Sequence, residues 1–209
     1  MKKHILHLLL LANISTAFAQ GNQNALNFDG SNDYVQTGYT GISGNTARTV
    51  EAWIKTTVNS NPSTGAAQHV IVDWGTTATG GRFTLNIMWG NTLRIEVGGS
   101  GINGKTVLND GNWHHVAASY DPSATYKFCL YVDGVLDTSA NNTTTVNTTS
   151  GNTLIIGKRV DNVNYFEGEI DEVRVWNHAR TASQIADLFD KELCPNHSGL
   201  VAYFRLNQG

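Results

Sequence analysis

Hydrophobic and polar residues alternate along residues 49–57. Val50, Ala52 and Ile54 occupy every second position, whereas Glu51 and Lys55 fall between them. Because successive side chains of a β-strand point to opposite faces, this pattern predicts a strand with one dry face and one wet face.

Similar β-branched and aromatic runs recur along the chain, each bounded by Gly, Asn, Asp or Ser. Turn-forming residues at the ends of such runs are typical of antiparallel strands joined by turns, and Asp133-Gly134 is a strong signal for a tight hairpin. Half-buried strands of this kind pair into two stacked sheets. The sequence therefore predicts an all-β sandwich with strands at residues 25–28, 34–37, 49–57, 69–74, 82–89, 92–97, 113–120, 126–132, 153–157 and 166–176.

One convincing helix is predicted at residues 181–190. Thr181 and Gln184 have the spacing of a capping box, in which each side chain satisfies a backbone N–H of the first turn. Ile185, Leu188 and Phe189 form an apolar stripe along the same segment. We expect this helix to pack over one end of the sandwich.

The N-terminus has the order of features found in a secretory signal peptide. Lys2 and Lys3 precede an apolar run at residues 5–11, and Ala17-Phe18-Ala19 supplies small residues for cleavage after Ala19. The apolar run is shorter than the roughly 20 residues of a membrane-spanning helix, and no later run is longer. We therefore expect a signal peptide at residues 1–19, an N-terminal extension at 20–24, and an exported protein that is secreted, periplasmic or on the cell surface.

The charge balance excludes one class of partner. Without Lys2 and Lys3 the chain has 12 basic and 17 acidic side chains, a net charge near −5 with histidine neutral. No Lys/Arg cluster offers a counter-charge to phosphates, so nucleic acid is not expected to bind. The remaining length, about 190 residues, suits one all-β domain.

The two cysteines, Cys129 and Cys194, both lie in the part expected to be exported. An oxidising compartment allows a disulfide between them. The sequence leaves the pairing open, because cysteines far apart along the chain need not meet in the fold.

Four stretches together resemble the LamG-like jelly-roll domains of the concanavalin A-like lectin/glucanase superfamily. They are ALNFDGSNDYV (25–35), TVEAWIK (49–55), DGNWHHVAASYD (110–121), and LYVDG (130–134) followed by GEIDEVRVWNHARTASQI (168–185). The resemblance implies a two-sheet antiparallel jelly roll over residues 25–193. The C-terminal segment, 194–209, contains SGLVAYFRLNQG (198–209), which resembles the opening segment of a further module or the end of this one. It therefore implies a longer parent chain.

The histidine-rich stretch at 110–121 is expected to be structural. Strand alternation turns Trp113 and His115 to one face and His114 to the other, so one ion cannot easily bind both histidines. No serine stands in a nucleophile-elbow context that either histidine could activate. We expect the segment to pack as a central strand, with Trp113 in the interior.

Three carboxylates, Glu167, Glu169 and Asp171, alternate along one predicted strand, superficially like the acidic triplet of glucanases in the superfamily. Val173 and Val175 continue the same parity, so without a bulge this face would become the core. The order Glu-x-Glu-x-Asp also departs from the Glu-x-Asp-x-Glu or Glu-x-Asp-x-x-Glu order of those enzymes. Glycoside hydrolysis is therefore the less favoured interpretation.

The same carboxylates raise the possibility of a calcium site. Asp29, Asn32 and Asp33 offer oxygen ligands in one turn, and Asp171 would approach them where the first and last strands of such a jelly roll lie side by side. The alternative is that the turn is an Asx-type turn without a metal.

Candidate ligand-binding residues lie on the predicted wet faces and near the strand ends. Trp53 on the wet face offers a platform for a sugar ring, with Glu51 beside it to accept hydroxyl hydrogen bonds. Trp74 and Trp89 carry the same hypothesis, and Arg82 and Arg94 are fork-like donors suited to a uronic acid or sulfate. Each has a plainer alternative, namely packing for the tryptophans and a solvated charge for the arginines.

These observations favour an exported, non-catalytic, lectin-like module that binds glycan or another extracellular protein. Two alternatives stay open, a glycoside hydrolase or polysaccharide lyase of the same superfamily and a structural adhesin spacer. The sequence does not identify the ligand, since specificity in shared scaffolds lies in variable loops.

Overall fold

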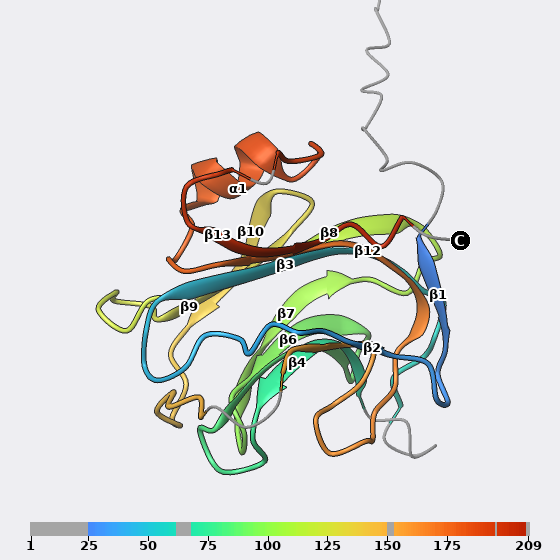
Figure 1. Ribbon diagram of the computed structural model, residues 1–209, viewed down its shortest axis with the longest axis horizontal. Coiled ribbons are helices and arrows are strands. Elements are labelled where there is room, and N and C mark those ends of the chain that lie inside the picture. The colour runs from blue at the N-terminus through green and yellow to red at the C-terminus, as the bar shows by residue number, and fades with distance from the viewer. Residues whose placement is uncertain (1–24, 62–67, 150–152, 195, 208–209) are drawn as a thin grey trace, which may run out of the picture.

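The computed structural model describes residues 25–61, 68–149, 153–194 and 196–207. The predicted signal peptide (1–19) and N-terminal extension (20–24) lie outside these residues. Two antiparallel sheets stack on each other, and a helix lies above the outer side of one of them (Figure 1). The all-β sandwich expected from the alternating pattern is confirmed.

The larger sheet has seven strands. Its order is β1 (Leu26–Asp29), β12 (Glu167–Trp176), β3 (Arg48–Lys55), β8 (Trp113–Tyr120), β9 (Phe128–Val132) and β10 (Val135–Ala140), and β13 (Leu200–Phe204) also pairs with β12. The turn between β9 and β10 is tight, as the Asp-Gly pair predicts: Asp133 and Gly134 both have positive φ, 49° and 77°.

The smaller sheet has six strands. Its order is β2 (Val35–Gln36), β11 (Ile155–Ile156), β4 (His69–Gly75), β5 (Arg82–Met88), β6 (Thr92–Glu96) and β7 (Gly101–Val107). Strand β7 was not predicted, because GINGKTV has no regular alternation of apolar residues. It forms as the edge strand beside β6, and Asp137 of β10 accepts hydrogen bonds from the N–H groups of Lys105 and Thr106 on it.

The apolar faces of the two sheets form one continuous core. Val50, Ala52 and Ile54 are fully buried in it, as the alternation predicts, and Phe83 and Leu85 contribute from β5. Trp113, which we expected in the interior, is instead half-buried: it lies opposite Lys55 on the outer face, and the Lys55 ammonium is 6.0 Å from its ring centroid.

A β-bulge in β12 changes the direction of its side chains. The pairing of β12 with β3 shifts register between Asp171 and Arg174, and Glu172 has a positive φ of 53°. The extra residue reverses the parity of the strand, so Val173 reaches the core although Asp171 lies on the outer face. The carboxylates and the valines therefore do not share a face.

The predicted helix is α1 (Ala182–Leu188), and its capping box is confirmed. The Thr181 side chain accepts from the N–H of Gln184, and the Gln184 side chain accepts from the N–H of Thr181. The position of the helix differs from our expectation, because it covers the outer face of the seven-stranded sheet rather than one end of the sandwich (Figure 1).

The two histidines of β8 point to opposite faces, as the strand geometry predicts. His115 lies opposite Trp53 on the outer face, and His114 lies opposite Ile54. His114 contacts Asp133 and Asp110 at 2.8 Å and 3.2 Å from its two ring nitrogens. These carboxylate contacts are structural bonds between β8 and its flanking turns.

The cysteines do not form the disulfide that the sequence left open. Both are free thiols: Cys129 is half-buried in β9, and Cys194 is exposed in the segment after α1. Within the described ranges, no helix is long and apolar enough to cross a membrane.

Candidate functional site

Trp53 is not the open sugar platform that the sequence suggested. It lies on the face opposite the core, but only 9% of it is exposed because the end of the helical segment covers it. Its indole N–H donates to the carbonyl of Phe189 at 3.0 Å, and the Phe189 ring stacks on it with a centroid separation of 6.3 Å. The plainer alternative, packing, is correct for this tryptophan.

Glu51 is also unavailable to a ligand, since its side chain is fully buried beneath the same cover. It forms an ion pair with Arg180, and Arg174 and His115 lie 3.8 Å and 3.6 Å from its second oxygen. Burial by itself raises the pKa of Glu51, but the proximity of His115, Arg180 and Arg174 brings it below its ordinary value. Glu51 is therefore an ionised anchor for the covering segment.

The three carboxylates of β12 do not line an open groove. Glu169 forms an ion pair with Lys55 at 2.9 Å, and Glu167 lies opposite Asp29 in the sheet. Asp171 is 4% exposed beside Trp53, and burial raises its pKa to about 7. Glu167 is exposed, Glu169 is paired with Lys55 and Asp171 is buried, so the three do not form an open acidic triplet.

The four residues predicted to bind calcium are not brought together. Asp29 lies opposite Glu167, and Asp171 is four residues further along β12, about 13 Å at the rise of a strand. The turn itself forms the Asx-type alternative: the Asp29 carboxylate accepts from the N–H groups of Ser31 and Asn32, and these bonds lower its pKa. Its Asp33 accepts from the N–H of Asp29. Among the described residues, no group of three or more His, Cys, Asp or Glu side chains that could hold a metal ion is found.

The other two predicted tryptophans differ from each other. Trp74 is fully buried in the core, where it packs on Phe83 and donates to the carbonyl of Ile42. It cannot contact a ligand. Trp89, in the turn after β5, is 52% exposed and stays a candidate.

Polar side chains gather on the outer face of the six-stranded sheet. We name this set the polar face: Asp73 of β4, Arg82, Thr84 and Asn86 of β5, and Arg94 and Glu96 of β6. These residues alternate with core residues and lie in register, since Thr84 is opposite both Asp73 and Glu96 and Asn86 is opposite Arg94. The polar face includes Arg82, one of the predicted ligand-binding residues.

Ion pairs hold the charged side chains of the polar face in place. Arg82 and Arg94 both approach Glu96, Arg82 through a direct hydrogen bond and Arg94 at 3.6 Å. Arg94 also donates to Asn103 at 2.8 Å, on the exposed edge strand β7. The side chain of Arg94 is 13% exposed, whereas Asp73, Thr84 and Asn86 are fully buried, so solvent reaches the polar face beside Arg94.

Asp73 closes the other side of the polar face. One of its oxygens accepts from the Thr84 hydroxyl at 2.7 Å, and the other accepts from the N–H of Val160 at 2.9 Å. Burial raises its pKa to about 7, although these bonds and the charges of Arg82 and Arg159 oppose the rise. The loop that contains Val160 thereby covers this end of the sheet.

Several polar atoms of this face lack a hydrogen-bond partner among the described residues. Both amide atoms of Asn86 are buried without one, and so are the Nε atoms of Arg82 and Arg94. A buried polar group without a partner costs roughly 1–3 kcal/mol. Three neighbouring side chains with this defect on one face are typical of a place where a ligand or water supplies the missing bonds.

Arg82 and Arg94 were expected from the sequence as ligand donors, whereas Asp73, Thr84, Asn86 and Glu96 were not. The signal was present: Arg82, Thr84 and Asn86 occupy every second position of one strand, and Arg94 and Glu96 do so in the next. Strand pairing was needed to show that these rows lie beside each other.

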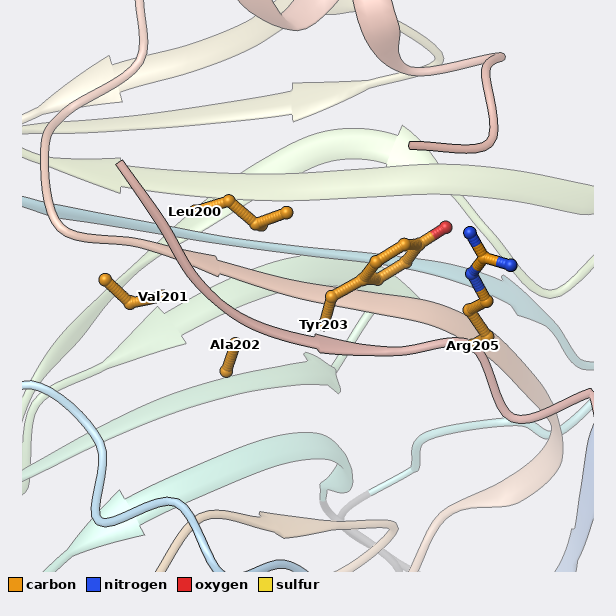
Figure 2. A pocket seen from close by; sticks show the side chains of 5 residues that line it. All are labelled: Leu200, Val201, Ala202, Tyr203 and Arg205. Atoms are coloured by element: carbon orange, nitrogen blue, oxygen red, sulfur yellow. The ribbon is translucent and has the colours of Figure 1, made fainter. Parts of the chain in front are cut away.

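A separate hollow of about 280 Å³ runs beside β13. Its lining comes from this strand and Arg205 just after it, and Figure 2 shows Tyr203 and Arg205 side by side while Ala202 points away from them. The Arg205 guanidinium lies 5.3 Å from the Tyr203 ring centroid. With no second element converging on it, this hollow is a weaker candidate than the polar face.

A family model, Laminin_G_3, described as the concanavalin A-like lectin/glucanases superfamily, matches residues 29–186. A crystal structure of a proposed carbohydrate-binding protein from Bacteroides ovatus is similar with a TM-score of 0.69 and 25% sequence identity. The similarity covers 88% of this chain and 51% of that protein, so this chain spans about half the length of that relative.

Two further structures share the fold at lower identity. Domain 4 of an extracellular arabinanase from Geobacillus stearothermophilus, in complex with arabinotriose, has a TM-score of 0.51 and 23% identity over 70% of this chain and 68% of its own. A sialidase CBM40 from Ruminococcus gnavus, bound to sialyllactose, has a TM-score of 0.53 and 18% identity over 68% of this chain and 83% of its own. No curated protein matches the sequence.

Proposed function

Because this chain belongs to the Laminin_G_3 family of the concanavalin A-like lectin/glucanases superfamily, we propose that it is an exported, non-catalytic module that binds carbohydrate through the polar face. The similarity to the Bacteroides ovatus protein supports carbohydrate as the ligand class. Residues 1–19 support export, because they have the features of a signal peptide.

The unpartnered amide of Asn86 is the observation on which this proposal depends. A sugar hydroxyl both donates and accepts, so vicinal hydroxyls can satisfy the amide oxygen and the amide nitrogen together. Each bond formed removes a cost that the free protein bears. Because Asn86 is fully buried in the free protein, the proposal requires the segments that cover the polar face to move when the ligand binds.

The ion pairs around Asn86 prepare the face for a ligand. Glu96 holds Arg82 and Arg94 in fixed orientations, which reduces the side-chain entropy lost when a ligand binds. The Nε atom of Arg82 has no hydrogen-bond partner among the described residues, whereas that of Arg94 lies 3.6 Å from Oε2 of Glu96. The polar face therefore contains hydrogen-bond donors from two arginines, and one donor group and one acceptor from the amide of Asn86.

The proposal of a non-catalytic role is supported by the state of the carboxylates. Both oxygens of Asp73 accept hydrogen bonds from the protein, and Glu96 is committed to arginines. Glu169 is paired with Lys55, and Asp171 is buried under the helical segment. A glycosidase needs two carboxyls about 5 Å apart, or further apart with room for water, flanking an exposed sugar bond.

We propose that the partner is a glycan, presented outside the cell. The relative from Bacteroides ovatus is about twice as long as the matched region. We propose that other modules of a longer parent chain act together with this one.

A glycan array tests the proposed function. The wild type should bind a subset of glycans, and Asn86→Ala and Arg94→Ala should each weaken binding at least about tenfold, since each removes a hydrogen bond to the ligand. Lys127→Ala is the matched control, because it removes an exposed positive charge far from the polar face along the chain. It should bind like the wild type.

Two results would contradict the proposal. Binding that survives both polar-face substitutions in folded protein would remove this face as the site. Release of reducing sugar from a bound glycan would show that the protein is an enzyme.

A further inference from the structure

A second hollow, of about 300 Å³, lies on the opposite side of the sandwich from the polar face. Trp176, at the end of β12, lies on the outer face of the seven-stranded sheet, opposite Thr49. His178 follows it, α1 contributes Gln184 and Asp187, and the segment before β13 contributes His197 and Ser198. We name this the Trp176 hollow, and it is built by three separate segments of the chain.

The walls of the Trp176 hollow are fixed to each other. The N–H of Asn177 donates to the carbonyl of Gly199 at 2.9 Å, which joins the two histidine-bearing segments. Gly199 has a φ of 81°, and a Cβ atom there would lie 2.4 Å from the ring of His178. Only glycine allows this close approach, so the hollow is a formed feature of the fold and does not depend on loose surface chains.

The floor of the hollow is aromatic and has no free positive charge. The rings of His178 and His197 each contact the indole of Trp176 in a T-shaped arrangement, with centroid separations of 5.9 Å and 6.3 Å. The Arg180 guanidinium stacks 4.2 Å from the indole centroid, but its charge is balanced by Glu51. An anionic ligand therefore finds no uncompensated arginine there.

The polar groups of the hollow match hydroxyl groups. The indole N–H of Trp176 is buried and has no hydrogen-bond partner among the described residues. The Gln184 side-chain oxygen is used by Thr181, which leaves its NH₂ group as a donor beside the Ser198 hydroxyl. Asp187 supplies a carboxylate that accepts hydrogen bonds and repels anions.

We propose that the Trp176 hollow binds one neutral sugar unit, as a second carbohydrate site separate from the polar face. Its volume lies at the lower end of the range for small-molecule pockets, about 300–1,000 Å³, which suits a single ring. Aromatic rings with a few converging donors and acceptors are the usual composition of such pockets. That the ligand is a carbohydrate rests on the proposed function. The location of the site rests on the residues of the hollow itself.

The indole N–H of Trp176 provides a direct test by NMR. The chain has five tryptophans, and the signal lost in Trp176→Phe identifies this indole N–H. Glucose, galactose, mannose, xylose, arabinose and N-acetylglucosamine are titrated separately, with glucuronate as the anionic probe. At least one neutral sugar should shift the Trp176 signal in a saturable way, and His197→Ala should weaken that response about tenfold.

The variants distinguish the two sites. Asn86→Ala should leave the Trp176 response intact, whereas it should weaken binding to the glycan array at least about tenfold. If no neutral sugar shifts the Trp176 signal while array binding still depends on Asn86, the second site is wrong and the proposed function stands. If the Trp176 response is intact but array binding ignores Asn86, the polar face is wrong and the second site stands.

Two further results would overturn the second site. One is a Trp176 response that disappears in Asn86→Ala, because it would then arise from the polar face. The other is glucuronate binding more tightly than every neutral sugar, which would contradict the neutral ligand class. Far-ultraviolet circular dichroism of each variant confirms that it is folded.

Discussion

Two residues on the outer face of β3 are buried although their alternation with core residues predicts exposure. Glu51 and Trp53 alternate with core residues and so have the positions of surface groups. The segment that includes α1 buries both, and Glu51 then serves as the counter-ion of Arg180 and Arg174. A buried carboxylate of this kind is stable only while its partners are present.

Glu51→Ala should lower the free energy of unfolding by about 3–5 kcal/mol, because it leaves the buried Arg180 without its counter-ion. Urea denaturation measures the change. Glu169→Ala is the matched control, since its ion pair with Lys55 is about one-third exposed on each side and should contribute less than about 1 kcal/mol. Equal losses for the two variants would show that the Glu51 cluster is not a special anchor.

Asp73 is expected to make stability depend on pH. Its pKa is raised to about 7 in the folded protein, whereas in the unfolded chain it keeps an ordinary value near 3.8. The folded state thus retains a proton that the unfolded state loses, so this contribution is complete below pH 3.8 and is lost as pH rises through about 7.

Asp73→Asn should therefore become more stable relative to the wild type as pH rises from 4 to 7, by ~2–4 kcal/mol. Denaturation curves at several pH values measure the difference. For Asp121→Asn, a turn carboxylate whose pKa is lowered by hydrogen bonds from Ser123, the difference from wild type should be constant above pH 5. A constant difference for Asp73→Asn as well would mean that Asp73 is ionised in the folded protein.

At the scale of elements, α1 and the bulge in β12 decide what the outer face of the seven-stranded sheet exposes. The bulge at Glu172 turns Asp171 outward while Val173 stays in the core. Arg174, the next outward residue, donates to the carbonyls of Leu188 and Lys191 and so attaches the end of α1 to the sheet. The helix therefore mainly covers charged residues of the sheet. Its own apolar packing is small, since Ile185 is its buried residue.

Thr181→Ala should cost about 1 kcal/mol, because it removes the capping hydrogen bond to the N–H of Gln184. Thermal denaturation measures the loss as a lower Tm. Asp187→Ala, at an exposed helical position, is the control and should be neutral or slightly stabilising. A neutral Thr181→Ala would show that the docking of Arg174, and not the cap, holds the helix.

At the scale of the whole molecule, the two sheets of the sandwich present different outer faces. The seven-stranded sheet is covered by α1, with the Trp176 hollow beside it, and the six-stranded sheet carries the polar face. The edge of the sandwich has the Asp29 turn, which is complete through its own backbone hydrogen bonds.

We expect EDTA to leave the Tm unchanged, because the predicted calcium ligands are separated and the Asp29 turn needs no ion to be satisfied. Differential scanning calorimetry with EDTA, and after addition of Ca²⁺, measures this. A Tm that falls with EDTA and recovers with Ca²⁺ would show a structural calcium site despite the strand register.

The sequence by itself determined the sandwich, most of its strands, the Asp133-Gly134 turn and the capped helix. The strands follow from the alternation of apolar residues, the turn from residues that adopt positive φ, and the helix from its capping side chains. Each of these causes acts over a few residues. Strands β7, β10 and β13 were absent from the predicted strands. GINGKTV of β7 lacks alternation, and the β13 sequence resembled either the opening of a further module or the end of this one; in the fold it pairs with β12.

Only the tertiary structure decided which surfaces are free. Trp53 and Glu51 have the pattern of exposed residues and are buried, whereas Asn86 and Arg94 become neighbours only through the register of β5 and β6. The parity of Asp171 depended on one bulged residue. Covering, register and bulges arise from contacts between residues far apart along the chain, and a local pattern carries no information about them.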